Sequence, residues 1–94
     1  MIAATPAVVR VVLPAALQLL FHQCPQETEV TAATVTEAID ALDACWPGMR
    51  HRICDERPAI RRHINIYIDG VRATLPTPLR QGGEMVIVMA ISGG

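Results

Sequence analysis

The last stretch of the chain, Glu84–Gly94 with the sequence EMVIVMAISGG, constrains the fold more than any other. Its first part predicts a strand, because alternate residues from Met85 onward form one apolar face, and Val86 and Val88 lie on the other face, which is apolar too. A strand with two apolar faces is either central in a sheet covered on both sides, or it presents one face to a partner.

The strand leads directly into Ser92, Gly93 and Gly94, which carry no charge and little side-chain bulk. We expect this end to be mobile, since terminal residues without a buried anchor usually are. A narrow diglycine end fits an enzyme's channel, because glycine has no Cβ to clash. A carboxylate becomes a good acyl donor once ATP adenylates it, and sulfide attack then gives a thiocarboxylate. We therefore hypothesise that the carboxyl end is the working part of the chain.

Composition indicates one folded domain spanning residues 1–94, with 92–94 as its tail. Hydrophobic residues make up 51% of the chain and charged residues 18%, which is typical of a folded domain. The net charge of -1 gives no strong attraction to nucleic acid or membrane. The basic residues are all Arg. The three cysteines, Cys24, Cys45 and Cys54, show no paired spacing, and no signal peptide or membrane-length apolar run is visible. These features predict a cytoplasmic protein without a membrane segment.

The first third of the chain predicts two strands around a short helix. Alternation over Val8–Leu13 places Val9, Val11 and Leu13 inward and Arg10 outward. Pro14 ends this strand, and Glu27–Ala32 is a weaker second strand. Between them, residues 15–22 favour a short helix with one apolar stripe, formed by Ala16, Leu17, Leu20 and Phe21.

A capping box predicts the main helix. In Thr34-Val-Thr-Glu37 the Thr34 hydroxyl can accept from the Glu37 amide, and the Glu37 carboxylate can reach back to the Thr34 amide. The helix should run to about Trp46 and end at Pro47-Gly48. Its expected buried stripe comprises Val35, Ala38, Ile39, Leu42 and Cys45, and its wet face Glu37, Asp40 and Asp43.

The remainder predicts a hairpin, followed by an irregular crossing over Leu79 that Pro76 and Pro78 impose. Met49–Asp55 has room for one more helical turn, and residues 50–63, with five of the Arg residues, are expected to form a surface loop. His63–Asp69 alternates as a strand with its isoleucines inward, and Asp69-Gly70 is a hairpin turn signal that should pair Val71–Thr74 with it. With one principal helix, this order predicts an α+β fold whose sheet is covered on one face.

Other chemistry is poorly supported by the residues. His51-x-x-Cys54 with His22-x-Cys24 fits no complete zinc pattern. A Cys54 nucleophile lacks a third orienting group, and a serine nucleophile at Ser92 would lack rigid support. We therefore assign no catalytic residue and no metal ligand.

The arginine-rich stretch has two interpretations. It contains Arg50, Arg52, Arg57, Arg61 and Arg62, which could bind phosphate or an acidic partner. A solvated loop is favoured, because such charge runs usually solvate a surface. Nucleic-acid binding is disfavoured further, since no aromatic platform is interleaved with these arginines.

Taken together, these motifs resemble the ThiS/MoaD family of ubiquitin-like sulfur carriers. The resemblance rests on the first strand with its short helix, the helix from Thr34 to Trp46, the strand from Ile64 to Gly70, the pattern Pro78-Leu79-x-x-Gly82-x-Glu84, and the Ser92-Gly93-Gly94 end. The long arginine-rich connection is more similar to carriers that serve cysteine synthesis than to the compact small subunit of molybdopterin synthase.

This resemblance implies a β-grasp fold, with a mixed sheet of about five strands in which the first and last strands are parallel neighbours. It implies that an E1-like adenylating enzyme, using ATP and magnesium, activates Gly94, and that a sulfur-accepting synthase takes the sulfur. Ser92 and Gly93 would enter the partner's active site, and Val86 and Val88 would form the docking surface. The chain itself would bind no cofactor and would act as a carrier, not an enzyme.

Two other functions remain open at this point. The chain could be a protein modifier joined through Gly94 to lysines of target proteins. Because it contains no Lys, such a modifier could not build polymers on its own side chains. Alternatively, it could be a structural or regulatory β-grasp subunit with an inert tail.

Overall fold

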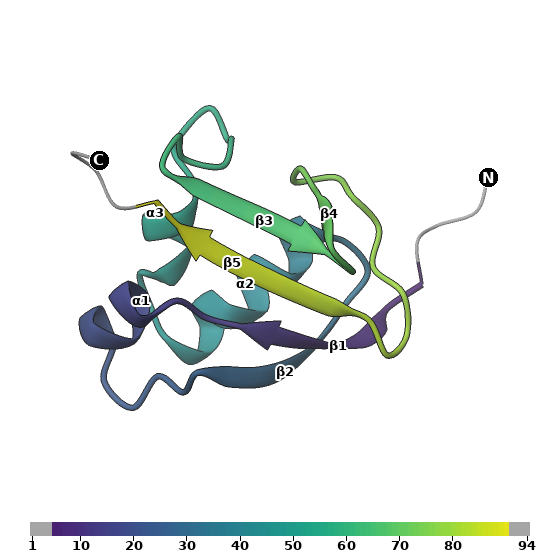
Figure 1. Ribbon diagram of the computed structural model, residues 1–94, viewed down its shortest axis with the longest axis horizontal. Coiled ribbons are helices and arrows are strands. Elements are labelled where there is room, and N and C mark those ends of the chain that lie inside the picture. Colours follow the sequence, from purple (N-terminus) through teal and green to yellow (C-terminus); the bar gives the residue numbers. More distant parts are fainter. Residues whose placement is uncertain (1–4, 91–94) are drawn as a thin grey trace.

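A five-stranded mixed sheet with the strand order β2-β1-β5-β3-β4 is the framework of the molecule (Figure 1). The structure is a computed structural model that describes residues 5–90. Its elements in chain order are β1 (Ala7–Val12), α1 (Ala15–Leu20), β2 (Glu27–Ala32), α2 (Val35–Cys45), α3 (Met49–Ile53), β3 (Ile64–Ile68), β4 (Val71–Arg72) and β5 (Glu84–Met89). The predicted α+β fold is confirmed, and the arrangement is that of a β-grasp domain.

The last strand lies in the middle of the sheet. β5 pairs in parallel with β1, with Val12 opposite Val86, and antiparallel with β3, with Ile66 opposite Ile87. β1 also pairs antiparallel with β2. The expected parallel pairing of the first and last strands is therefore correct, and β5 lies between β1 and β3.

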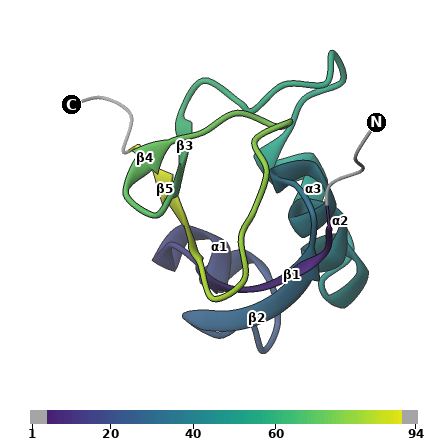
Figure 2. The ribbon, with the colours of Figure 1, turned by 90° about the vertical axis from the view of Figure 1, so that its right-hand side faces the viewer.

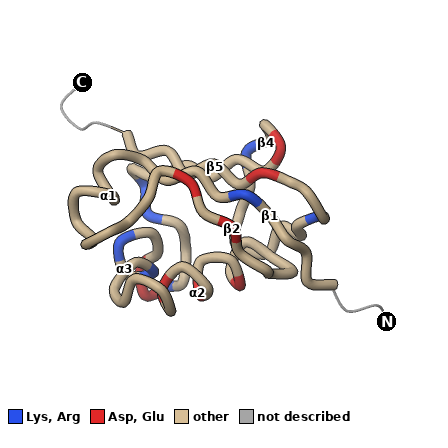
Figure 3. Tube along the Cα trace, turned by 90° about the horizontal axis from the view of Figure 1, so that it is seen from below, with Lys and Arg blue, Asp and Glu red and all other residues tan. Residues whose placement is uncertain are grey.

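One face of this sheet is sealed by helices. Val9, Val11, Ile66, Met85 and Ile87 are at most 2% exposed. Figure 3 shows α2 and α3 together on one side of the sheet. The alternation predicted for β1, β3 and β5 therefore directs these side chains into a single core, which burial of apolar area stabilises.

The segment between β4 and β5 ties the start of α2 to the sheet (Figure 2). Leu79 is buried and donates its N–H to Ala33 O at 2.9 Å, while Val35 N–H donates to Thr77 O at 3.0 Å. The crossing over Leu79 expected from the prolines is thus held by backbone hydrogen bonds.

The α2 cap differs in one half from the predicted box. Thr34 Oγ1 accepts from the Glu37 N–H at 3.3 Å as expected, but Glu37 Oε1 accepts from the Ala33 N–H at 3.0 Å, not from Thr34. The carboxylate therefore reaches one residue further back. This still satisfies a free donor beside the helix start, so the cap has the same stabilising role.

Two predicted apolar stripes are shorter in the structure. Of the four residues expected on one face of α1, only Leu17 is fully buried, and Leu20 is 51% exposed, because this short helix touches the core through a single turn. Cys45 was expected in the buried stripe of α2, but it is exposed at the last helical residue, where the chain has passed the core.

The helical turn expected within residues 49–55 is present, so the expected surface loop over residues 50–63 begins as a helix. Residues 49–53 form α3, and Met49, Ile53 and Cys54 are buried. Asp43, expected to be fully wet, is half-buried, and its Oδ1 accepts from the N–H groups of Gly48 and Arg50 at 3.0 Å each. This carboxylate therefore caps the start of α3, a role that its position near the end of α2 did not reveal.

The predicted hairpin is present but short. Asp69 and Gly70 have positive φ values of 51° and 85°, as a tight turn between β3 and β4 requires. Pairing was expected over Val71–Thr74, but β4 contains only Val71 and Arg72, after which Ala73 donates its N–H to Ile66 O at 2.8 Å. The chain then leaves the sheet and exposes the outer edge of the first part of β3.

The open face of the last strand as the candidate functional site

The sheet face opposite the core, called the open face below, carries the two predicted docking residues. Strand register places Val86 between Val12 of β1 and Tyr67 of β3, and Val88 opposite Asn65. The open face is therefore apolar along the middle of the sheet. Val12 and Tyr67 were not among the predicted site residues, although the alternation of β1 and β3 already pointed them outward.

Burial distinguishes the two faces of β5 sharply. Met85 is 0% exposed, whereas Val88 on the opposite face is 41% exposed and Val86 is half-buried. Of the two alternatives for this strand, the first is wrong: the strand is central in the sheet, but only one of its faces is covered within residues 5–90. An uncovered apolar strip of this kind favours contact with another molecule.

Charged side chains border the apolar strip at one end. Arg10 forms a hydrogen-bonded ion pair with Glu84 and lies 3.8 Å from Glu27 (Nη1 to Oε2). The hydrogen bond to Glu84 is the main reason that the pKa of Arg10 is raised. The ion pairs leave little net charge there, so the apolar strip is the main feature of the open face.

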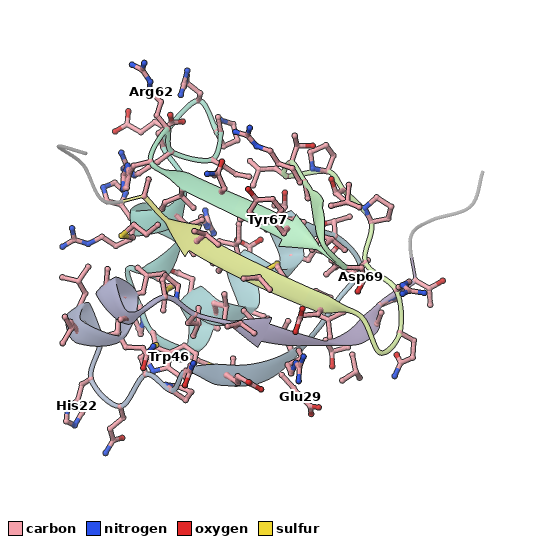
Figure 4. All side chains as sticks on the ribbon, in the orientation of Figure 1. His22, Glu29, Trp46, Arg62, Tyr67 and Asp69 are labelled. Atoms are coloured by element: carbon pink, nitrogen blue, oxygen red, sulfur yellow. The ribbon has the colours of Figure 1, made fainter. Side chains whose placement is uncertain are left out.

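The start of β5 is fixed by the β3–β4 turn. Asp69 Oδ1 accepts from the Glu84 N–H at 3.0 Å, and its Oδ2 accepts from Arg80 Nε at 2.8 Å (Figure 4 labels Asp69). The hydrogen bond from Arg80 is the main reason that the pKa of Asp69 is lowered. Gly83 is needed in this position, because a Cβ would lie 3.0 Å from Arg80 O and 3.3 Å from the Asp69 carboxylate.

The other end of β5 is held by backbone pairing and by the Met89 side chain, which packs partly buried against the core. Just past the strand, Ala90 donates its N–H to His63 O at 2.7 Å, which is the last described backbone hydrogen bond of this segment. Residues Ser92, Gly93 and Gly94, predicted to carry the chemistry, lie outside the described residues. Near this end of the sheet α1 presents Leu19, which is 88% exposed, and Leu20 (Figure 1).

The sites that the sequence disfavoured show no assembled chemistry in the described part of the chain. Cys54 and Cys24 are buried, and burial raises the pKa of both thiols, which disfavours the reactive thiolate. Within residues 5–90, no three His, Cys, Asp or Glu residues are grouped so as to hold a metal ion. No helix in those residues has the length and apolar character needed to cross a bilayer.

A β-grasp sheet whose central last strand has one open apolar face defines a ubiquitin-like carrier or modifier. No family model matches the chain. The small archaeal modifier protein 1 of Haloferax volcanii is 32% identical over 62 residues, which are 66% of this chain and 71% of that protein. The chain therefore belongs to the ThiS/MoaD family of ubiquitin-like carriers and modifiers.

Solved structures agree with this assignment. The crystal structure of small archaeal modifier protein 1 from Haloferax volcanii matches with a TM-score of 0.79 at 26% identity, over 94% of this chain and 100% of that chain. The Amycolatopsis orientalis BexX/CysO complex contains a chain that matches with a TM-score of 0.80 at 26% identity, over 92% of this chain and 99% of that chain. CysO of Mycobacterium tuberculosis, at 22% identity and a TM-score of 0.80, shares the fold.

Proposed function

We propose that this chain is a sulfur carrier whose Gly94 carboxylate is adenylated by an E1-like enzyme and converted to a thiocarboxylate. A sulfur-accepting synthase then takes the sulfur. The chain is a co-substrate in this scheme, a single domain that works in the cytoplasm and binds no cofactor of its own. Its relatives, small archaeal modifier protein 1 and CysO, are proteins of the same ubiquitin-like family, and the BexX/CysO complex shows one of them with a protein partner.

The chemistry needs only the chain end. A Gly94 carboxylate oxygen attacks the α-phosphorus of ATP, pyrophosphate leaves, and an acyl adenylate forms on the partner, which holds ATP and magnesium. Hydrosulfide then adds to the Gly94 carbonyl carbon, and AMP departs with the carboxyl oxygen that it received. The product is an anionic thiocarboxylate sulfur that can attack an electrophilic substrate on the synthase. Gly93 and Ser92 lead Gly94 into the narrow active site, where a larger side chain would clash.

One observation carries the proposal. β5 is hydrogen-bonded on both sides, its start is fixed by Asp69, and its open face is uncovered within residues 5–90. The same strand leads, after Ala90 and Ile91, into Ser92-Gly93-Gly94. A partner that docks on Val86 and Val88 therefore contacts the same strand that leads to the reactive carboxylate. Because the docking residues lie on this rigid strand, docking helps to orient the reacting group.

Intact mass spectrometry tests the proposal. The full chain is incubated with candidate E1-like enzymes, ATP, magnesium and sulfide. A mass gain equal to exchange of one oxygen for one sulfur at the carboxyl terminus is the expected result. The matched controls omit ATP or carry one extra residue after Gly94. An exchange that occurs without ATP, or that survives the added residue, would contradict the mechanism.

A second function is favoured by the relatives that bear the name small archaeal modifier protein 1. The same acyl adenylate can pass to a lysine amine of a target protein instead of to sulfide, which gives an amide through Gly94. Because this chain contains no Lys, any such conjugate is a single attachment or is extended on other proteins. Conjugates of higher mass recovered with the chain from cells would identify this function.

A further inference from the structure

A groove at the outer edge of β3 is separate from the open face. It lies between the loop that follows α3 and the segment that follows β4, and its volume is about 380 Å³. In Figure 1, β4 lies beside only the last part of β3, and the loop after α3 stands beside the first part. Its apolar lining is formed by Pro58, Ala59, Ile60, Ile64, Ile66, Ala73, Leu75 and Pro76.

The groove follows a strand edge that lacks a partner strand. β4 pairs with β3 only at Tyr67 and Ile68, and the Ala73 N–H to Ile66 O bond is the last rung of the ladder. Ile64 and Asn65 pair with β5 on one side, and no described strand lies on their other side, although the Ile64 N–H already donates to Arg61 O at 2.9 Å. An exposed strand edge of this kind can accept an extended peptide as an added strand.

The charges around the groove are of one sign. Arg61, Arg62 and Arg72 line it, and no Asp or Glu does. Within residues 5–90, Arg62 and Arg72 form no ion pair, whereas four other arginines pair with carboxylates: Arg10, Arg50, Arg57 and Arg80. On a chain with a net charge of -1, this local excess of positive charge favours an acidic partner.

The arrangement of these arginines fits a peptide better than a single phosphate. Arg61 donates its Nε–H to His51 O at 2.9 Å, which fixes that guanidinium at one end of the groove. Arg62 extends away from the sheet at the outer edge of the loop (Figure 4), and Arg72 comes from β4. Because Arg72 comes from another element than Arg61 and Arg62, these side chains can pair with carboxylates spaced along a segment.

We propose that this groove binds an extended, acidic segment of a partner protein. The segment lies along the outer edge of β3, where the Ile64 C=O can accept a backbone hydrogen bond, places alternate apolar side chains on the groove's lining, and pairs its carboxylates with Arg62 and Arg72. Ile64 lies opposite Met89, so the segment lies one strand away from the end of β5. The groove thus supplies a second contact for a protein that handles the carboxyl end, away from Val86 and Val88.

A peptide titration followed by NMR tests this site without any activating enzyme, so its outcome is independent of the proposed function. The isotope-labelled full chain is titrated with a blocked peptide of alternating Val and Glu, and in parallel with the same peptide carrying Lys for Glu and with inorganic pyrophosphate. The expected result is binding of the Glu peptide alone, with amide shifts centred on residues 64–66 and 72–75 and affinity that falls as salt is added.

Charge reversal supplies the matched controls. Arg62→Glu and Arg72→Glu are each expected to weaken the Glu peptide about tenfold, equivalent to about 1.4 kcal/mol. Arg52→Glu makes the same charge change on exposed α3, outside the groove, and should leave most of the affinity. Any one of four outcomes would overturn the proposal. These are equal binding of the Lys peptide, binding of pyrophosphate at the same residues, equal losses of affinity for the Glu peptide in all three variants, and self-association that protects this edge.

Discussion

The two faces of β5 both carry apolar residues, but they differ in burial. Met85 and Ile87 are at most 2% exposed beneath the helices, whereas Val88, one residue further along the strand, is 41% exposed. The sealed face contributes the stability of the fold, because burial of apolar area is the main favourable term. The open face leaves apolar area uncovered within residues 5–90, and in the proposed function a partner binds there. Substitutions on the two sides of this strand should therefore have different consequences.

The largest expected effect lies on the sealed face. Ile66 is 0% exposed and pairs with Ile87 across the sheet, so Ile66→Ala should lower the free energy of unfolding by about 2–5 kcal/mol through a core cavity. Val88→Ala on the open face is the matched control and should change it by less than about 1 kcal/mol. Denaturant unfolding measures both. Similar losses for the two variants would show that the faces are not distinct.

Low pH should weaken the hydrogen bonds that Asp55 accepts in the loop after α3 and those that Asp69 accepts at the start of β5. Hydrogen bonds from Arg57 lower the pKa of Asp55 to about 2, and the Arg80 hydrogen bond lowers that of Asp69. A lowered folded-state pKa gives stability that is present above the unfolded-state pKa and is lost as the pH falls through the folded-state value. The melting temperature should therefore be steady near neutral pH and fall below about pH 4.

Single variants assign that acid sensitivity. Asp69→Asn should reduce the drop in melting temperature as the pH falls below about 4, and should lower the melting temperature at neutral pH. Asp43→Asn is a control, since it alters a cap on α3 and leaves the Asp69 contacts intact. If Asp69→Asn melts with the same pH profile as the unaltered chain, this ion pair contributes no acid sensitivity.

A smaller effect on stability, but a large effect on recognition, is expected at the open face. Val88→Asp places a charge on the exposed apolar strip, where water solvates it in the free chain but a docked partner would bury it. Affinity for the activating enzyme should fall about tenfold, or about 1.4 kcal/mol, with nearly unchanged melting. Calorimetric titration gives the affinity. An unaltered dissociation constant would remove this face from the docking surface.

The smallest effect on stability is expected at the chain end. Gly94→Ala lies beyond Ala90, where the described hydrogen bonds of β5 stop, so the melting temperature should change little. The same change should abolish adenylation, because the added methyl group clashes in a channel shaped for glycine. Differential scanning calorimetry and ATP-dependent pyrophosphate release measure the two properties. A large loss of stability would mean that this end is packed against the domain.

The fold could be predicted from the sequence where local patterns agree with tertiary contacts. Alternation in β1, β3 and β5 and the Thr34 cap are strong local signals, so these elements and their inward faces are as predicted. The errors lie where the outcome depends on distant neighbours. Cys45 continues the helical period but lies past the core, whereas the helical turn expected within residues 49–55 is present as α3 and is capped by Asp43, which was expected to be wet.

The candidate site could be predicted only in part. Val86 and Val88 follow from strand period and family resemblance, whereas Val12 and Tyr67 join them through the sheet order, which no local pattern reveals. The β3 edge groove was missed because it arises where β4 stops after two residues, although four paired residues were expected there. Its arginines were visible in the sequence, but which of them lack a carboxylate partner depends on the fold.

The central claim is that the Gly94 carboxylate is chemically activated and carries sulfur. The most direct test is the intact mass of the chain recovered from its own cells under sulfur-rich and sulfur-poor growth. The account predicts a fraction with one terminal oxygen replaced by sulfur, which rises and falls with sulfur supply and is absent when one residue is added after Gly94. An unmodified carboxyl terminus under every condition would contradict it.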